Sequence, residues 1–320
     1  MSDFRLSLFN TAFDTIGTES NIDKELKDIM LGKYKTSIEK CRNALLVDED
    51  KESYKKNKSK LKAVTFCGLF ENGRKLEHLV KYNRLVVIDI DDIPNVQNIK
   101  SILSLDRYIM ALWLSPSSLG LKGLIKIDSS VDNHKKYFYS LSVYFLQNYG
   151  VELDKSGSDI TRLCYVSWDP EIYINYDSKI FNEIIDLPLS QKESDKNKIP
   201  EPTKTLVVPK NAFATEGLNK AVDRQLLKKI TSYLTSKNLS ITDDFSNWVK
   251  VAVIVANSFS YDLGEGYFLT LCRLDGITHN EERSKELLKY CYANRNLNLS
   301  NRISIATLLY LAKKKGFVKR

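Results

Sequence analysis

The chain has 320 residues with 43% hydrophobic and 28% charged side chains, and its formal net charge is +8. These proportions are typical of a soluble globular protein with room for two domains, and they exclude a disordered tail. Apolar runs stay shorter than the roughly 20 residues needed to cross a bilayer, and the first residues lack a basic-then-apolar signal layout, so we expect a cytoplasmic protein with no membrane partner. The five cysteines and three histidines follow no zinc-binding spacing, which predicts reduced, buried thiols.

The first 187 residues mix helical and strand-like segments. Helical patterns cover residues 22–31, 37–47, 95–103 and 133–149. Segments rich in β-branched and aromatic residues predict strands over residues 63–70, 84–90, 108–114, 121–127 and 162–167. This part of the chain therefore reads as an α+β domain.

A charged, proline-containing stretch divides the chain. Prolines fall at positions 188, 200, 202 and 209 around a run without apolar periodicity, which predicts a linker at 188–212 between domains at 1–187 and 213–320. Beyond it, helical patterns cover residues 217–237, 245–259, 264–274, 281–293 and 304–315. We therefore expect a small all-α domain after the α+β domain.

Four lysines gather before the first predicted strand, at Lys55, Lys56, Lys58 and Lys60. Runs of like charge are commonly solvated surface. They also attract the phosphates of a nucleic acid in a salt-sensitive way. DNA binding by these lysines is therefore one of two readings.

The predicted strand at 84–90 runs into a D-x-D motif. Because side chains alternate along a strand, Asp89 and Asp91 project from one face while Val86, Ile88 and Ile90 project from the other. Paired carboxylates are hard oxygen ligands that suit Mg²⁺ or Mn²⁺, which favours phosphate chemistry. The alternative is ordinary loop polarity, with the next residue, position 92, capping the helix at 95–103.

The segment from Ser115 to Lys122 reads S-P-S-S-L-G-L-K and joins two predicted strands. Small hydroxyl residues and a glycine let backbone N–H groups approach an anion, and Lys122 can contact a phosphate as a point charge. The alternative is a plain hairpin turn. The spacing does not fit the loop of P-loop NTPases.

A third segment, residues 153–170, places Asp154 before a predicted strand and Arg162 at its start. Asp154 is a candidate third metal ligand, and Arg162 is a candidate bidentate phosphate clamp. The alternative is an acidic loop in which Asp159 pairs with Arg162 at the surface.

In this order, the three motifs resemble the signature of the archaeo-eukaryotic primase superfamily, most closely a VirE-like branch found in Bacteroidetes mobile elements and phages. The resemblance covers about residues 55–185, including A-V-T-F-C-G at 63–68 and V-V-I-D-I-D-D at 86–92. The helical part, around Trp248, 264–274 and 301–312, is similar to the primase C-terminal module. The resemblance implies a primase-like (RRM-like) β-sheet catalytic domain flanked by helices.

The resemblance also implies the activity, a template-dependent nucleotidyl transfer that makes primers. Its partners would be a single-stranded DNA template, an NTP or dNTP, and a separate replicative helicase. The residues that the resemblance implies as catalytic metal ligands are Asp89, Asp91 and Asp154. Those implied to contact the nucleotide's phosphates are Ser115, Ser117, Lys122 and Arg162. The chain departs from the pattern twice, with Lys122 where many members have histidine and Ser118 where glycine is usual.

Two other functions fit parts of the sequence. A primase-like domain can serve as a non-catalytic replication initiator or DNA-binding adaptor, because fold does not fix function. A D-x-D phosphatase would use Asp89 as nucleophile and Asp91 as acid. We rank the phosphatase last because Ile93 stands where such enzymes have Thr or Val, and because it leaves Asp154 and Arg162 unexplained.

Overall fold

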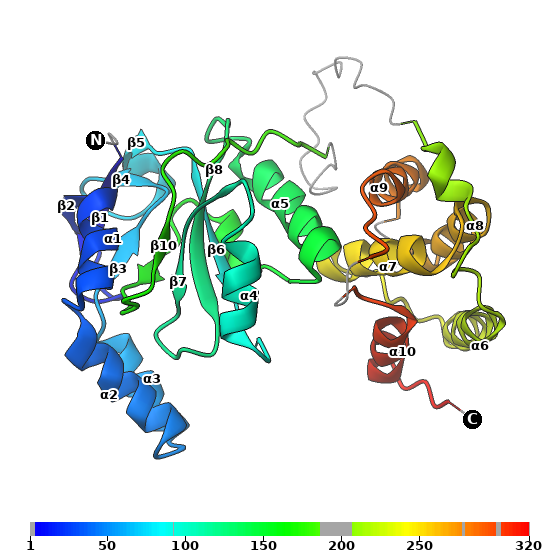
Figure 1. Cartoon of the computed structure of the whole chain (residues 1–320), viewed down its shortest axis with the longest axis horizontal. Coiled ribbons are helices and arrows are strands. Elements are labelled where there is room, and N and C mark those ends of the chain that lie inside the picture. Colours follow the sequence, from blue (N-terminus) through cyan, green and yellow to red (C-terminus); the bar gives the residue numbers. More distant parts are fainter. Residues whose placement is uncertain (1–3, 92, 186–206, 277–278, 299–301, 320) are drawn as a thin grey trace. The chain divides into compact units, whose positions relative to one another are not determined.

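The computed structural model of the chain describes residues 4–91, 93–185, 207–276, 279–298 and 302–319 (Figure 1). The chain divides into two compact units. Unit 1 comprises Met1–Tyr139 with Leu153–Ile184, and unit 2 comprises Ser140–Glu152 with Ile185–Arg320. Residues 188–206 of the predicted linker lie outside the described residues, and the short helix η3 (Lys210–Phe213) forms at its end.

Unit 1 contains antiparallel sheets and helices, so the predicted α+β class is confirmed. One sheet has the order β2-β1-β3-β9, from strands Thr18–Asn21, Arg5–Phe9, Ala63–Thr65 and Cys164–Tyr165. The second has the order β10-β7-β8-β6, from strands Tyr173–Ile174, Ile109–Leu114, Leu121–Lys126 and Leu85–Ile90. A two-stranded sheet pairs β4 (Gly68–Phe70) with β5 (Leu79–Tyr82).

The helices described in unit 1 are α1 (Ile22–Leu31), α2 (Lys35–Leu46), α3 (Lys51–Ser59), α4 (Val96–Leu103), η1 (Leu76–His78) and η2 (Lys155–Ser158). Side chains cap the starts of four of them, α1, α3, α4 and η2. Figure 1 shows α2 and α3 side by side. Asn95 caps α4 by accepting from the Asn98 N–H, so the helix after the D-x-D motif has a cap of its own. Residue 92, the cap proposed from sequence, lies outside the described residues.

Two strand predictions are corrected. The predicted strand at 63–70 is two strands in different sheets, because the chain turns after Thr65, whose hydroxyl donates to the Gly68 carbonyl. The predicted strand at 162–167 shortens to β9, and Arg162 lies outside it. The lysine run was not assigned a structure from sequence, and most of it forms α3.

Strand β6 is buried on both faces. Leu85 and Val87 belong to the main hydrophobic core of unit 1, together with Trp113 of β7 and Leu124 of β8. Because residues two apart share a face, the side chain of Asp89 follows Leu85 and Val87 on the core-facing side. The D-x-D motif therefore begins at the border of a packed core.

A buried ion pair fixes the end of β7. Lys100 of α4 donates to Asp169 at 2.6 Å, and the two side chains are 7% and 2% exposed. The Asp169 carboxylate also accepts from the backbone N–H of Leu114, at 2.8 Å, and of Glu171, at 3.0 Å. Asp169 therefore ties the loop after β9 to the strand that leads into the S-P-S loop.

Replacing Asp169 by alanine should lower the free energy of unfolding by about 3–5 kcal/mol, because it leaves a buried lysine without its partner. Urea denaturation measures this change. Adding Lys100→Met to the Asp169→Ala variant should restore part of the loss, because the unpaired charge is then removed. A loss under 1 kcal/mol for Asp169→Ala would contradict this role.

Unit 2 is helical. Its helices are α6 (Ala221–Lys237), α7 (Phe245–Ser258), α8 (Tyr261–Cys272), α9 (Glu281–Ala293) and α10 (Ile305–Lys314). All five correspond to helices expected from sequence. Residues 251–258 of α7 are buried throughout, so α7 is the central helix of this unit's core. Helix α5 (His134–Tyr149) contributes Val143 and Leu146 to the same core.

Two expectations about composition can be compared with the structure. The five cysteines are free and buried, as predicted. Within the described residues, the helices are too short or too polar to cross a membrane.

Candidate active site

The D-x-D motif faces a lysine on the neighbouring strand. Asp89 of β6 and Lys122 of β8 are register partners, and the Lys122 Nζ donates to Asp89 Oδ2. The side chains are 15% and 9% exposed, so this ion pair is shielded from bulk water. Asp91, two residues further along, is exposed. The first and second motifs therefore meet through a shielded ion pair.

The S-P-S segment forms the β7–β8 hairpin loop, so the hairpin reading of the sequence is confirmed. The Ser115 N–H donates to the Gly120 carbonyl at 2.9 Å, and the hydroxyls of Ser115 and Ser117 are 2.9 Å apart. Ser118 has φ +63°, a left-handed conformation that glycine adopts more easily, so the loop keeps a glycine-like turn at this departure from the family pattern.

The hairpin loop lies against the end of β6. A Cβ atom at Gly120 would collide with the carbonyl oxygen of Ile90 and would lie 3.3 Å from the Asp91 Cα. Only a residue without a side chain allows this approach. Gly120 thus brings the hairpin loop against the end of the D-x-D strand, and this placement is compatible with phosphate contact as well as with a turn.

The third segment packs on the other side of β6. The Asp154 N–H donates to the Asp89 carbonyl at 2.8 Å, and a Cβ atom at Gly157 would lie 2.5 Å from the Val87 carbonyl oxygen. The Asp154 carboxylate accepts from the Ser156 N–H at 2.7 Å, which starts helix η2. The backbone of Asp154 therefore holds it beside the D-x-D strand, and its side chain caps η2.

The surface-loop alternative paired the side chains of Arg162 and Asp159, but among the described residues the Arg162 group that bonds to Asp159 is its backbone N–H, which donates to the Asp159 carbonyl at 3.0 Å. The Asp159 carboxylate instead accepts from the backbone N–H and the hydroxyl of Thr161, at 2.8 and 2.9 Å. Arg162 is exposed, and its charge acts on Asp154. The structure thus distinguishes the two aspartates of this segment, since Asp154 bonds to the D-x-D strand through its backbone and Asp159 shapes the turn before Arg162.

The charges of the three motifs act on one another. Desolvation of its carboxyl group, with repulsion from Asp89 and Asp154, raises the pKa of Asp91 above its usual value. Partial burial of Asp154 opposes ionisation, but hydrogen bonds from Ser156 and the nearby charge of Arg162 hold its pKa below the usual value. Burial alone would lower the pKa of Lys122, but the neighbouring Asp89 carboxylate outweighs burial, and the pKa is raised above its usual value. The lysine therefore stays charged at neutral pH.

The carboxylates offer a partial fit to a divalent cation. Asp89 Oδ1 is buried and has no hydrogen-bond partner among the described residues. An ionised oxygen in that position favours a cation ligand, because an uncompensated buried charge is costly. Among the described residues, however, no three Asp, Glu, His or Cys side chains lie close enough together to hold a metal ion. Asp89 and Asp91 fit Mg²⁺ or Mn²⁺ by their chemistry, and Asp154 as third ligand stays a prediction.

Helices α2 and α3 add residues that the motifs did not indicate. Arg42 of α2 donates to the Trp168 carbonyl at 2.7 Å and to the Ser115 carbonyl at 3.4 Å, and its Nε is buried without a partner among the described residues. It therefore links the second motif to the third. A lone arginine in an amphipathic helix gave no signal for this role.

Tyr54 and Lys58 of α3 also face the site. Burial raises the pKa of the Tyr54 hydroxyl, while the nearby Ser117 and Lys122 oppose that rise. The positive charge of Lys58 opposes the raised pKa of Asp91. The Lys58 Nζ lies 5.6 Å from the centre of each of the rings of Tyr54 and Tyr165. The other lysines of the predicted DNA-binding run, Lys55, Lys56 and Lys60, are exposed. Their role in DNA binding stays a prediction.

Repulsion at the D-x-D motif should appear in the pH dependence of stability. Because the pKa of Asp91 is raised in the folded protein, the ionised carboxylate lowers the free energy of unfolding at pH values above that pKa. This loss of stability disappears as the pH falls below the ordinary pKa of an aspartate side chain. Without metal, Asp91→Asn should raise the free energy of unfolding at pH 7 by up to about 1 kcal/mol. The gain should be absent near pH 3, about one unit below the usual aspartate pKa.

The matched measurement is thermal unfolding in EDTA and in Mg²⁺ or Mn²⁺. Bound cations should raise the melting temperature of the wild type more than that of Asp91→Asn, since they bind the folded state through this carboxylate. Asp128→Asn, at an exposed carboxylate after β8, serves as the control. A gain for Asp91→Asn that persists at low pH would contradict the repulsion.

Comparison with known proteins supports the importance of this stretch. Residues 56–174 match the model of the family described as BT4734-like, N-terminal domain. Neither the curated proteins nor the solved structures contain a significant match to the chain. The matched residues include all three motifs and Lys58, whereas Arg42 and Tyr54 precede them. The part of the chain that carries the candidate site is thus similar to a domain family found in Bacteroidetes proteins, consistent with the VirE-like branch that the motifs resemble.

Proposed function

We propose that the chain is a template-dependent nucleotidyltransferase, a primase-polymerase of the archaeo-eukaryotic primase superfamily. It would synthesise primers on single-stranded DNA from NTPs or dNTPs during replication of a mobile element or phage. The observation that supports this most strongly is the meeting of three distant motifs, because Asp89 pairs with Lys122 and accepts the backbone hydrogen bond of Asp154. Carboxylates beside two cationic side chains suit a metal-bound nucleoside triphosphate.

The residues divide between binding and charge compensation. When bound, divalent cations would lower the pKa of the attacking 3′-hydroxyl and stabilise charge on the leaving pyrophosphate oxygen, and Asp89, Asp91 and Asp154 would hold them. Lys122 and Arg162 would neutralise the triphosphate, while Ser115 and Ser117 would orient it. Attack of the hydroxyl on the α-phosphorus forms the new phosphodiester and releases pyrophosphate, without a covalent bond to the protein.

The environment of Asp89 weighs against the phosphatase. A carboxylate nucleophile needs access to the phosphorus, but Asp89 is 15% exposed and one of its oxygens is paired with Lys122. The phosphatase also leaves Asp154 without a purpose at the site. The non-catalytic initiator differs from our proposal in chemistry alone, so an activity assay must separate them.

The test is synthesis on a primer-free template. The wild type and an Asp89→Ala/Asp91→Ala double variant are incubated with single-stranded DNA, Mg²⁺ or Mn²⁺, and labelled NTPs or dNTPs. The proposal predicts new oligonucleotides with the wild type that are missing with the variant. Equal DNA binding by both proteins with no product from either would favour the initiator. Phosphate release from monoesters, independent of template, would favour the phosphatase.

A further inference from the structure

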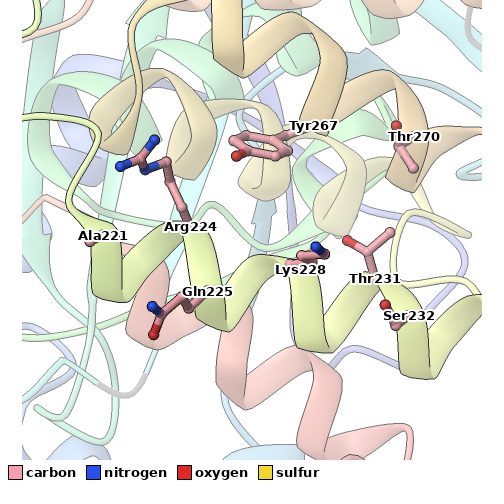
Figure 2. Close-up of a pocket in the computed structure, with 8 residues that line it drawn as sticks. All are labelled: Ala221, Arg224, Gln225, Lys228, Thr231, Ser232, Tyr267 and Thr270. Atoms are coloured by element: carbon pink, nitrogen blue, oxygen red, sulfur yellow. The ribbon is translucent and has the colours of Figure 1, made fainter.

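Unit 2 carries a groove between α6 and α8, outside the carboxylate site. It has a volume of about 510 Å³. Figure 2 shows Arg224, Lys228 and Thr231 extending from α6, and Tyr267 and Thr270 from α8 on the other side. All of its lining residues belong to unit 2, so the groove is complete within one compact unit. A cavity of this size accommodates one or two units of a polymeric ligand or a small molecule.

The charged residues of the groove are both basic. Arg224 and Lys228 are four residues apart on α6, so they lie on the same helix face, where like charges repel and destabilise the helix. Both are exposed, and within the described part of the chain neither pairs with a carboxylate. The described lining contains no acidic residue. An anion that contacts both side chains would replace their repulsion with attraction.

The opposite side of the groove offers an aromatic ring. The Tyr267 ring is partly exposed and packs against Phe259, with the ring centres 4.9 Å apart, which fixes the plane of the ring. Thr231 and Thr270 also line the groove, and the Thr270 hydroxyl donates to the Gly266 carbonyl at 2.7 Å. Basic side chains beside a fixed aromatic ring are the combination that binds single-stranded nucleic acid, because phosphates pair with the cations and bases stack on the ring irrespective of sequence.

We infer that the groove between α6 and α8 binds single-stranded DNA, with Arg224 and Lys228 on successive phosphates and Tyr267 stacked on a base. The choice of single-stranded DNA as the ligand rests on the proposed function. The function of the helical unit would then be to bind the template, independently of the carboxylates of Asp89 and Asp91. Binding here needs no catalysis, so it can be measured apart from nucleotide transfer.

The test uses the full chain, a fluorescein-labelled single-stranded oligo(dT) and fluorescence anisotropy. The groove variant is Arg224→Gln/Lys228→Gln. The matched control is Lys220→Gln/Lys237→Gln, which removes the same charge from exposed positions at the two ends of α6, outside the groove. Relative to the control, we expect the groove variant to bind about tenfold more weakly. The slope of log K against log salt should fall by about 1.4, as two phosphate contacts on a single strand require.

Tyr267→Ala should weaken binding by about tenfold, with little change in the salt slope, because stacking carries no charge. Equal affinities of the groove variant and the control would overturn the inference. The inference would also be overturned if free NTP, at a concentration equal to that of the DNA, displaced the oligonucleotide from the groove. The groove would then be a mononucleotide site. Circular dichroism and thermal unfolding confirm that each variant is folded.

The same titration with Asp89→Ala/Asp91→Ala separates this inference from the proposed function. Groove-dependent binding should persist in that variant. If the wild type makes no primers and the groove variant still loses affinity for DNA, the proposed nucleotidyltransferase function is wrong and the DNA-binding inference holds. If the wild type makes primers while the groove variant binds DNA like the control, the DNA-binding inference is wrong and the proposed nucleotidyltransferase function holds.

Discussion

Asp91→Asn is expected to reduce template-dependent nucleotide incorporation by at least about 10²-fold, the scale on which loss of one preorganised electrostatic group slows an enzyme. The substitution keeps the size of the side chain and removes a charged oxygen ligand. Because Asp91 is exposed and has a raised pKa, the same change should slightly stabilise the metal-free protein. Loss of activity in a more stable variant cannot be attributed to unfolding.

Asp89→Asn should be equally inactive but less informative. It leaves Lys122, which is 9% exposed, facing a neutral amide, so some loss of stability should accompany the loss of activity. Incorporation of labelled nucleotide on single-stranded DNA measures both variants, with Asp128→Asn as the control. Activity of Asp91→Asn within twofold of the wild type would remove this aspartate from the catalytic machinery.

Lys122→His is expected to make the reaction depend on pH. Asp89 raises the pKa of Lys122, so the wild-type side chain is charged throughout the range from pH 6 to 8. Histidine has an ordinary pKa of about 6.5, so its positive charge is largely lost over that range. The variant should keep part of the activity at the low end and lose about tenfold or more by the high end, relative to the wild type at each pH.

The control for this prediction is Lys122→Gln, which carries no charge at any pH and should be slow throughout. Its main effect should be a higher KM for the nucleotide, because a phosphate contact is lost. A flat pH profile for Lys122→His, or wild-type activity of Lys122→Gln, would show that Lys122 does not act by its charge. The ion pair with Asp89 would then serve the stability of the fold and not the reaction.

The arrangement of the D-x-D strand and its hairpin could be predicted because local rules decide it. Period-two alternation placed Asp89 and Asp91 on one face of the strand, and the apolar strands at β7 and β8 were long enough to be recognised. The register that sets Lys122 opposite Asp89 depends on the pairing of β6 with β8, which lie far apart in sequence. The composition of the hairpin loop and the resemblance to a primase motif, rather than periodicity, made Lys122 a candidate site residue.

The contribution of α2 and α3 could not be predicted. Arg42 reaches carbonyl groups at positions 115 and 168, and such contacts depend on tertiary packing that leaves no periodic or motif signal. The lysine run was visible, but its helical phase, which directs Lys58 and not its neighbours toward Asp91, requires the observed α3. The helices of unit 2 were predicted from apolar periodicity, whereas the groove depends on how α6 and α8 pack.

Template-directed selection of the nucleotide tests the central claim most directly. Wild-type protein is given oligo(dT) or oligo(dC) with all four labelled nucleotides, one at a time, in Mn²⁺ and Mg²⁺. The account predicts incorporation of adenine nucleotides on oligo(dT) and of guanine nucleotides on oligo(dC), with neither made by Asp91→Asn. Products that ignore the template, or the same incorporation by Asp91→Asn, would contradict a template-dependent nucleotidyltransferase at this site.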